Sequence, residues 1–201
     1  FDMDGTLIEE KSSWHLIHKH FRTVEAAKLS LKLYLEGRID YPEFVRQDIA
    51  LWPKPLHISE VMKILGKPRV RREAKRVVEA IHAKGLQTAI ISGGIEPLAR
   101  RVAEETGINH LIANGLQLDE KGFLTGEGLV KVDPAHKELA LKQLASSLGF
   151  KLDECVAVGD SKIDFEFLKA AGLGLLLGDE SLARQASVIS MKSLSEVLRY
   201  L

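Results

Sequence analysis

The chain opens with the stretch FDMDGTL at positions 1–7, which places two carboxylates, Asp2 and Asp4, two residues apart. If Phe1 closes a buried parallel strand, Asp2 lies at the carboxyl edge of the sheet, where open α/β sheets bind their ligands. Asp4 then lies in the following turn, and Gly5 lets the backbone leave the strand sharply because it lacks a Cβ. Two carboxylates so close repel each other unless a cation binds, and Mg²⁺ takes oxygen ligands. One carboxylate can act as a nucleophile and the other as an acid or base.

The bare Asp-x-Asp-Gly-Thr pattern is also typical of ordinary turns, because Asp and Gly are common turn residues. Three further segments favour a phosphate site. The segment IISGG at positions 90–94 ends an apolar strand in a hydroxyl and two glycines just before a helix. Backbone N–H groups and the positive end of a helix bind anions, and Ser92 can add a hydrogen bond. Alone, Ser-Gly-Gly is also an ordinary loop.

The other two segments are a lysine and a second acidic loop. Lys137 is near the start of an expected helix, where the dipole disfavours a cation, so a role in holding phosphate would explain its position. By itself a helical lysine is usually solvated surface, and Lys137 counts only through its place in the order of the motifs. The stretch VAVGDSKID at positions 156–164 again ends a strand in carboxylates. Asp160 is placed to complete a Mg²⁺ shell with Asp2, while Asp164 can orient the metal's waters or Lys137. An N-cap would explain one of these two acids but not both.

Composition limits the classes of function. The 201 residues are 45% hydrophobic, with 28 basic and 28 acidic side chains, a balance that argues against general nucleic-acid binding. No apolar run is long enough to span a bilayer, so we expect no membrane partner. The single Cys155 cannot form an internal disulfide, and a cytoplasmic location is expected. Because the chain starts at Phe1 without the apolar residues of a buried strand, we expect native residues before it, which leaves a targeting segment open.

The first part of the chain has a helical pattern without strands. We read the segment 9–68 as a helical insertion, and the basic run at 67–76 as the solvated face of a helix that returns to the main domain. Helices are expected at residues 12–37 with a break near 22–23, from Asp40 to Trp52, at 59–65 and at 69–84.

After Gly85 strands alternate with helices, which predicts a parallel sheet covered on both faces. Strands are expected at residues 86–91, 111–113, 155–158 and 173–177, helices at 96–106, 134–148, 163–171 and 194–201, and a hairpin or flap at 116–132. The predicted fold is therefore α/β, with a Rossmann-like parallel sheet, a helical insertion after the first strand and a small β-hairpin.

In this order the motifs resemble those of the haloacid dehalogenase superfamily: an Asp-x-Asp-Gly-Thr loop, a Ser at the end of the second strand, a Lys and Gly-Asp-x-x-x-Asp. The resemblance covers nearly the whole chain, and the Ser-Gly-Gly loop, the hairpin and Val-Ala-Val-Gly-Asp are most similar to the phosphoserine phosphatase branch. It implies a core domain at 1–8 and 69–201 and a helical cap at 9–68.

The resemblance implies a phosphomonoester hydrolase that acts on a small phosphorylated metabolite. Asp2 would attack phosphorus to form an aspartyl-phosphate, and Asp4 would protonate the leaving oxygen and then activate water. Mg²⁺ would be held by the side chains of Asp2 and Asp160 and the backbone carbonyl of Asp4. The phosphoryl oxygens would be bound by Ser92, Gly93 and Lys137.

The chain departs from this branch where the rest of the substrate would bind. Phosphoserine phosphatases resemble one another in having a glutamate nine residues after the nucleophile, where this chain has Lys11 beside Glu10. Their cap arginine aligns with Asp48, two residues after Arg46. These four are the candidate specificity residues of the cap, and their charges predict that phosphoserine is a poor substrate.

Two alternatives remain at this point. A phosphotransferase or phosphomutase would use the same aspartyl-phosphate but pass it to a hydroxyl. A non-catalytic protein would keep the fold to bind a phosphorylated metabolite, which the presence of both Asp2 and Asp4 disfavours.

Overall fold

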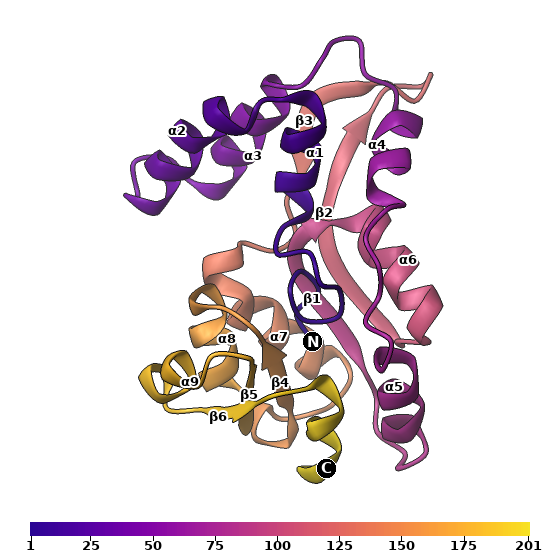
Figure 1. Cartoon of the computed structure of the whole chain (residues 1–201), viewed down its shortest axis with the longest axis vertical. Coiled ribbons are helices and arrows are strands. Elements are labelled where there is room, and N and C mark those ends of the chain that lie inside the picture. The colour runs from indigo at the N-terminus through magenta and orange to yellow at the C-terminus, as the bar shows by residue number, and fades with distance from the viewer.

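The computed structural model describes residues 1–201 and contains nine α-helices and six strands, with short 3-10 turns between them (Figure 1). The strands are β1 (Ala89–Ile95), β2 (His110–Leu118), β3 (Leu124–Leu129), β4 (Val156–Gly159), β5 (Leu173–Leu177) and β6 (Ile189–Met191). The helices are α1 (Ser13–Phe21), α2 (Val24–Leu35), α3 (Tyr41–Ala50), α4 (Ile58–Leu65), α5 (Ala74–His82), α6 (Glu96–Thr106), α7 (Lys137–Ser147), α8 (Phe165–Ala170) and α9 (Glu180–Ala186). The 3-10 turns are η1 (Pro134–His136), η2 (Leu152–Glu154), η3 (Lys162–Asp164) and η4 (Leu194–Arg199).

The first two residues join two three-stranded sheets. One sheet has the order β1-β2-β3 and the other β4-β5-β6, and all pairs are parallel except β2 with β3. Phe1 donates its N–H to Ala89 at 2.8 Å and accepts one from Ile91 at 2.9 Å, the pattern of a parallel pair. On the other side Asp2 donates to the carbonyl of Val158 at 2.8 Å. The expected first strand therefore lies between β1 and β4, and Asp2 is at its carboxyl end.

Helices cover both faces of this sheet, as the alternation of strands and helices predicted. Successive residues of one strand belong to different cores: Ile90 packs with the large cluster that includes α5 and α6, and Ile91 packs with the smaller cluster around Phe167. Val158 and Ala157 divide in the same way. Side chains of a strand alternate between faces, so this division is what a doubly covered sheet requires. The predicted α/β fold is confirmed.

The segment after the first strand forms α1 to α4, and α2 and α3 lie side by side at the upper left in Figure 1. Asp40, where this helix was expected to begin, caps α3 by accepting a hydrogen bond from the N–H of Glu43 at 2.9 Å. The β2–β3 hairpin, also expected, packs along α3. A short antiparallel bridge between His57 and Phe123 ties the hairpin to the start of α4. None of the nine α-helices combines the length and the apolar composition that a membrane span requires.

The structure corrects several predicted elements. The helix expected from residue 69 begins at Ala74, because Val70 pairs with Ile8 in an isolated bridge and residue 71 donates its N–H to Leu7. The final helix is instead the 3-10 turn η4. Helix α9 and strand β6 were not predicted, although Asp179 caps α9 through the N–H groups of the next turn, a signal that the sequence carries.

Candidate active site

The ammonium of Lys137 joins two aspartates from distant parts of the chain. Its Nζ lies 2.6 Å from Oδ1 of Asp2 and 2.6 Å from Oδ1 of Asp164, and all three side chains are buried. Burial by itself lowers the pKa of Lys137, but the two adjacent carboxylates outweigh it and raise that pKa. Burial raises the pKa of Asp2 against the opposing effect of the lysine. Lys137 is therefore a fixed positive charge beside Asp2, at the first turn of α7 where the sequence placed it.

Asp2 and Asp164 differ in what else they contact. Oδ2 of Asp164 accepts the N–H groups of Asp160 at 3.2 Å and Ser161 at 3.1 Å, and the Ser161 hydroxyl at 2.9 Å. Asp164 is thus engaged at both oxygens. No hydrogen bond reaches Oδ2 of Asp2, and Asp2 lines a cavity of about 480 Å³. Of the two carboxylates on Lys137, Asp2 is the one with an oxygen free to react.

Asp4 lines the same cavity, and Ser13 at the start of α1 holds its carboxylate. The backbone N–H and the hydroxyl of Ser13 both donate to Oδ2 of Asp4, at 2.9 Å and 2.8 Å. Its Oδ1 is buried without a partner. Burial raises the pKa of Asp4 to about 6, against the opposing hydrogen bonds from Ser13. A Cβ on Gly94 would lie 2.8 Å from Oδ2 of Asp4, so only glycine allows the loop this close. The result is a carboxyl group that can both carry and release a proton near neutral pH.

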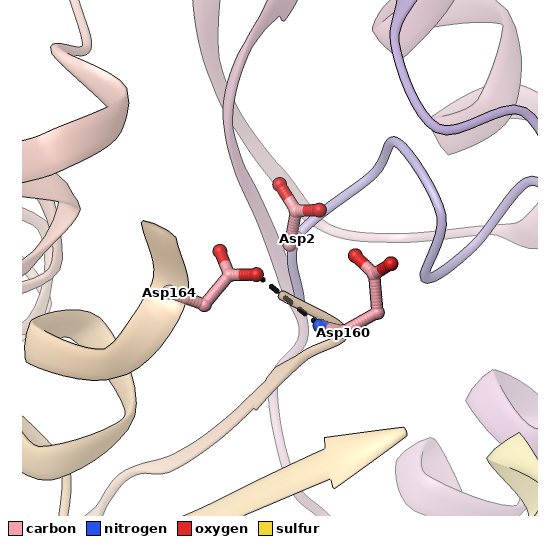
Figure 2. Close-up of side chains that lie close together, drawn as sticks. All are labelled: Asp2, Asp160 and Asp164. Carbon is pink, nitrogen blue, oxygen red and sulfur yellow. Dashed lines mark hydrogen bonds between the residues drawn. The ribbon is translucent and has the colours of Figure 1, made fainter. Parts of the chain in front are cut away.

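Three carboxylates can share a metal ion. Figure 2 shows the side chains of Asp2, Asp160 and Asp164 converging from the first strand, the end of β4 and the start of α8. One oxygen of each lies within 4.8 Å of the others. The donors are all carboxylate oxygens, which suit Mg²⁺, Mn²⁺ or Ca²⁺ better than Zn²⁺. Asp164 is completely buried and both of its oxygens accept hydrogen bonds, whereas Oδ2 of Asp2 accepts none and Oδ2 of Asp160 is paired with the exposed Lys11. Asp2 and Asp160 are therefore the better placed ligands, and Asp164 holds Lys137.

The pairing of β1 is irregular between Ser92 and Ile95, and the loop formed there is held by a buried asparagine that the sequence analysis missed. Asn114 Nδ2 donates to the carbonyl of Gly93 at 3.0 Å and to that of Val132 at 2.8 Å. The same Gly93 carbonyl accepts the indole N–H of Trp14 and the hydroxyl of Tyr41, each at 3.0 Å. Three donors on one carbonyl fix the orientation of this loop. In it, Ser92 is buried, and its hydroxyl accepts the N–H of residue 94 at 3.0 Å, which leaves the hydroxyl proton for the cavity.

Arg71 holds the loop that carries Asp2 and Asp4. Its Nε donates to the carbonyl of Thr6 and its Nη2 to the carbonyl of Gly5, each at 2.9 Å. The sequence analysis assigned the basic run at 67–76 to a solvated helix face, and for Arg71 this was wrong. Nothing local distinguishes Arg71 from its neighbours, because its partners lie more than sixty residues earlier.

The four candidate cap residues lie in different surroundings. Lys11 and Asp48 line the cavity, whereas Glu10 and Arg46 do not. Lys11 forms an ion pair with Asp160 at 2.5 Å. Asp48 is buried and accepts the hydroxyl of Ser30 at 2.6 Å. Arg46 pairs with Glu43 on the outer surface of α3, and Oε2 of Glu10 is buried without a partner. The structure brings together eight expected residues on the cavity or beside it: Asp2, Asp4, Lys11, Asp48, Ser92, Gly93, Lys137 and Asp160, with Asp164 behind Lys137.

The arrangement of motifs matches one family of known proteins. The family of haloacid dehalogenase-like hydrolases matches residues 1–169, most of the chain. The chain belongs to this family. Among curated relatives, the hydrolase is 32% identical to the phosphoserine phosphatase of Lactococcus lactis over 176 residues, which cover 87% of this chain and 80% of that protein. It is 27% identical to the phosphoserine phosphatase of Methanocaldococcus jannaschii over 205 residues, which cover 100% of this chain and 95% of that protein.

Solved structures agree with these relatives. A substrate-bound phosphoserine phosphatase complex superposes on the hydrolase with a TM-score of 0.82 at 25% identity, covering 100% of this chain and 96% of that one. A phospho-aspartyl intermediate analogue of phosphoserine phosphatase gives a TM-score of 0.82 at 26% identity with the same coverage. The hydrolase is thus a phosphatase of the phosphoserine phosphatase-like branch, which sets aside a purely non-catalytic role.

Proposed function

We propose that this phosphatase hydrolyses a small phosphomonoester with Mg²⁺ and through an aspartyl-phosphate on Asp2. The observation that supports this most directly is the asymmetry of Asp2. Its Oδ1 is held by the ammonium of Lys137 at 2.6 Å, while Oδ2 accepts no hydrogen bond and Asp2 borders the cavity. A carboxylate fixed at one oxygen and free at the other is arranged to attack with the free one.

Asp2 and Asp4 together account for each phosphoryl and proton transfer in the reaction. Oδ2 of Asp2 forms a bond to phosphorus as the bond from phosphorus to the leaving oxygen breaks, and the Asp4 carboxyl gives its proton to that oxygen. In the second half, Asp4 takes a proton from water while the water oxygen bonds to phosphorus and the Asp2–phosphorus bond breaks. The pKa of Asp4, raised to about 6 by burial, suits a group that must act once as acid and once as base.

The carboxylates of Asp2 and Asp160 fit Mg²⁺, with the backbone carbonyl of Asp4 as a third oxygen. The cluster supports this assignment because it offers only hard oxygen donors and an excess of buried negative charge. When bound, the ion supplies positive charge that offsets the repulsion between the attacking carboxylate and the phosphate dianion. Asp164 fixes Lys137 and the backbone of Asp160 from behind.

The phosphoryl oxygens are bound by three groups that line the cavity. Lys137 supplies a buried positive charge, Ser92 a hydroxyl proton, and the loop at Gly93 a backbone cradle whose rigidity comes from Asn114, Trp14 and Tyr41. Because Trp14 and Tyr41 belong to α1 and α3, the segment 9–68 serves as a cap that closes the cavity over the phosphate site. We place the core at 1–8 and 69–201.

The test is a hydrolysis screen over phosphomonoesters with and without Mg²⁺, with acid-quenched protein assayed for a hydroxylamine-sensitive phosphoryl label on Asp2. We expect phosphate release only with the metal and a label that Asp2→Asn abolishes. An alcohol acceptor is included in parallel. A phosphoryl group that passes to the alcohol in preference to water identifies a phosphotransferase instead, and full activity in excess EDTA refutes the metal assignment.

A further inference from the structure

We propose that the substrate is the phosphate ester of an uncharged, apolar alcohol, whose carbon skeleton packs against the apolar face of α2 and the aromatic side chains of α1 and α3. The proposal rests on the proposed function, since it concerns what is attached to the phosphate that Asp2 attacks. It is drawn from the half of the cavity that the cap supplies. In this half the charged side chains pair within the protein or are exposed to solvent, and apolar surface is left for the substrate.

Helix α2 presents an apolar face to the cavity. Four of its apolar side chains line the cavity at a spacing of three, four and three residues, which is that of one helical face: Val24, Ala27, Leu31 and Tyr34. Leu31 is 44% exposed although it borders a cavity, so part of its apolar surface is not covered by the protein. An apolar group that packs there removes this surface from water, which is favourable.

Aromatic side chains continue this wall with their rings. Tyr34, Tyr41 and Phe44 line the cavity with ring centroids 5.3 to 5.6 Å apart, and Trp14 of α1 lines it too. The polar atoms of these side chains already make hydrogen bonds to the core. The hydroxyl of Tyr34 donates to Asp133, and the Tyr41 hydroxyl and the Trp14 indole N–H donate to one backbone carbonyl. What these side chains offer a ligand is therefore ring surface, which packs on apolar groups and on other rings.

The buried histidine and the buried aspartate of the cap face each other. Nε2 of His18 lies 3.0 Å from Oδ2 of Asp48, and both residues are 3% exposed. Oδ1 of Asp48 accepts the hydroxyl of Ser30 at 2.6 Å, and Nδ1 of His18 lies 2.8 Å from the hydroxyl of Thr23. These four side chains satisfy one another within the cap. They therefore leave no group for the ammonium or the carboxylate of an amino acid ester.

The basic side chains on the cavity are exposed. Lys11 pairs with Asp160 at 2.5 Å, and its side chain is 72% exposed. Lys28 pairs with Glu25 at 2.8 Å, and its side chain is 65% exposed. His15 is exposed as well. An exposed cation gains little from a further ion pair, because water already solvates it. A charged leaving group would thus give up its own water against apolar walls without a buried counter-charge, which is costly.

The cavity also limits the size of the leaving group. Its volume of about 480 Å³ is at the small end of ligand sites, and the phosphate takes part of it. We therefore expect a single ring or a short alkyl chain, and neither a lipid tail nor a nucleoside.

Five esters of primary alcohols test the proposal as a set. Benzyl phosphate carries an apolar ring, ethyl phosphate only a methyl group beyond the reacting carbon, O-phosphoserine both charges, 3-phosphooxypropanoate only the carboxylate and O-phosphoethanolamine only the amine. Because all five release a primary alkoxide, differences in kcat/KM report chiefly on the pocket. We expect kcat/KM for benzyl phosphate to exceed that for every other ester at least about tenfold. A smaller lead for benzyl phosphate, or first rank for any other ester, overturns the proposal.

Two pairs of variants on α2 locate the apolar face. Leu31→Gln makes part of the face polar, and Ala27→Gln extends a polar group into the cavity, so each should lower the benzyl-to-ethyl ratio of kcat/KM at least about threefold. Leu29→Gln and Ala26→Gln are the matched controls, because both positions are exposed on the same helix and do not line the cavity. Their ratios should stay within about 1.5-fold of wild type. Because Leu31 is itself exposed, its variant keeps the core intact, and a smaller loss there, or an equal loss in Leu29→Gln, refutes the site.

Failure of the proposed function can be told apart from failure of this inference. Turnover of p-nitrophenyl phosphate with a labelled Asp2, but without preference for benzyl phosphate among the five esters, refutes only the inference. If no ester is hydrolysed, the proposed function fails, and calorimetric titration of the same five esters into the wild-type protein still ranks their affinities. A ranking in which benzyl phosphate does not bind most tightly refutes the inference in that case too.

Discussion

The ammonium of Lys11 lies 2.5 Å from Oδ2 of Asp160, so a carboxylate proposed to bind Mg²⁺ is paired with a cation from the chain itself. The two partners differ in mobility, since the side chain of Lys11 is 72% exposed and that of Asp160 only 4%. The flexible partner can therefore leave while the carboxylate stays in place. With Mg²⁺ on Asp160 as proposed, Lys11 and the metal ion would compete for this carboxylate, and we expect the exposed lysine to yield.

Replacing Lys11 should therefore strengthen Mg²⁺ binding. In Lys11→Met the competing ammonium is lost, and we expect the Kd for Mg²⁺ to fall roughly 1.5- to fivefold, the effect of an ion pair of about 0.2–1 kcal/mol. Isothermal titration calorimetry in substrate-free protein measures this directly. Lys19→Met, on an exposed position of α1 outside the cavity, is the control. A Kd that rises in Lys11→Met would show that the lysine helps to hold the metal site together.

Asp2→Asn should abolish turnover and leave the fold intact. An amide cannot attack phosphorus, and the side chain is nearly isosteric, so we expect a loss of several powers of ten in kcat. Circular dichroism establishes that the variant is folded, and a steady-state assay with p-nitrophenyl phosphate measures the loss. Activity within about tenfold of wild type, equivalent to only ~1.4 kcal/mol of barrier, would remove Asp2 from the role of nucleophile.

Asp4→Asn should slow phosphorylation of Asp2 most for poor leaving groups. The alkoxide leaving group of an alkyl ester needs the proton that Asp4 supplies, whereas p-nitrophenolate leaves without one. Comparing the two kinds of ester therefore separates loss of the acid from a general distortion of the active site. We expect the single-turnover rate of Asp2 labelling to fall roughly 10²- to 10⁴-fold with propyl phosphate and much less with p-nitrophenyl phosphate. Rapid quench measures both rates. Equal losses for the two esters would argue against Asp4 as the general acid.

The main site residues could be predicted because each follows a recognisable local pattern. Ser92 and Asp160 come at the ends of apolar stretches, Asp2 is in an Asp-x-Asp-Gly-Thr pattern, and the carboxyl ends of parallel strands meet at one edge of a sheet. The residues that hold these loops could not be found in this way. Arg71 and Asn114 bond backbone carbonyls that lie far away in sequence, so their roles depend on the tertiary fold and leave no periodic signal.

The same distinction explains what the sequence left out in the cap and the error at the chain end. The opposite charges of Lys11 and Asp48 suggested a changed substrate, but the sequence could not show that His18 faces Asp48 thirty residues away. At the C-terminus, the apolar pattern of residues 194–201 is compatible with an α-helix, yet the segment forms only a 3-10 turn against α5. Periodicity indicates which residues are buried and does not choose between two kinds of short helix.

Ca²⁺ should inhibit the Mg²⁺-dependent reaction. Mg²⁺ requires near-octahedral geometry with short bonds, whereas Ca²⁺ accepts more oxygens and bidentate carboxylates. A larger ion can draw the free Oδ2 of Asp2 into its own shell and away from phosphorus. We expect hydrolysis to fall as Ca²⁺ is added at fixed Mg²⁺, and to recover when excess Mg²⁺ is restored. Ca²⁺ that supports full activity in EDTA-treated protein would contradict this account.

Asn114→Leu should destabilise the protein and lower activity together, because this side chain joins the phosphate loop to the segment before α7. Its Nδ2 bonds the carbonyls of Gly93 and Val132, and its Oδ1 accepts the N–H groups of Lys131 at 2.7 Å and Val132 at 2.8 Å. Leucine has a similar size but satisfies none of these groups, and each buried group left unpaired costs about 1–3 kcal/mol. Since Trp14 and Tyr41 still reach the Gly93 carbonyl, the unpaired groups are chiefly those near Val132. We therefore expect the free energy of unfolding to fall by roughly 2–5 kcal/mol, measured by urea denaturation.

Gln117→Leu, on the exposed part of the same strand, is the control and should change stability by less than about 0.5 kcal/mol. Under conditions where Asn114→Leu is fully folded, kcat should still be reduced, since the loop that presents Ser92 has lost one of its three anchors. A variant as stable and as active as wild type would show that the other two donors hold this loop without Asn114.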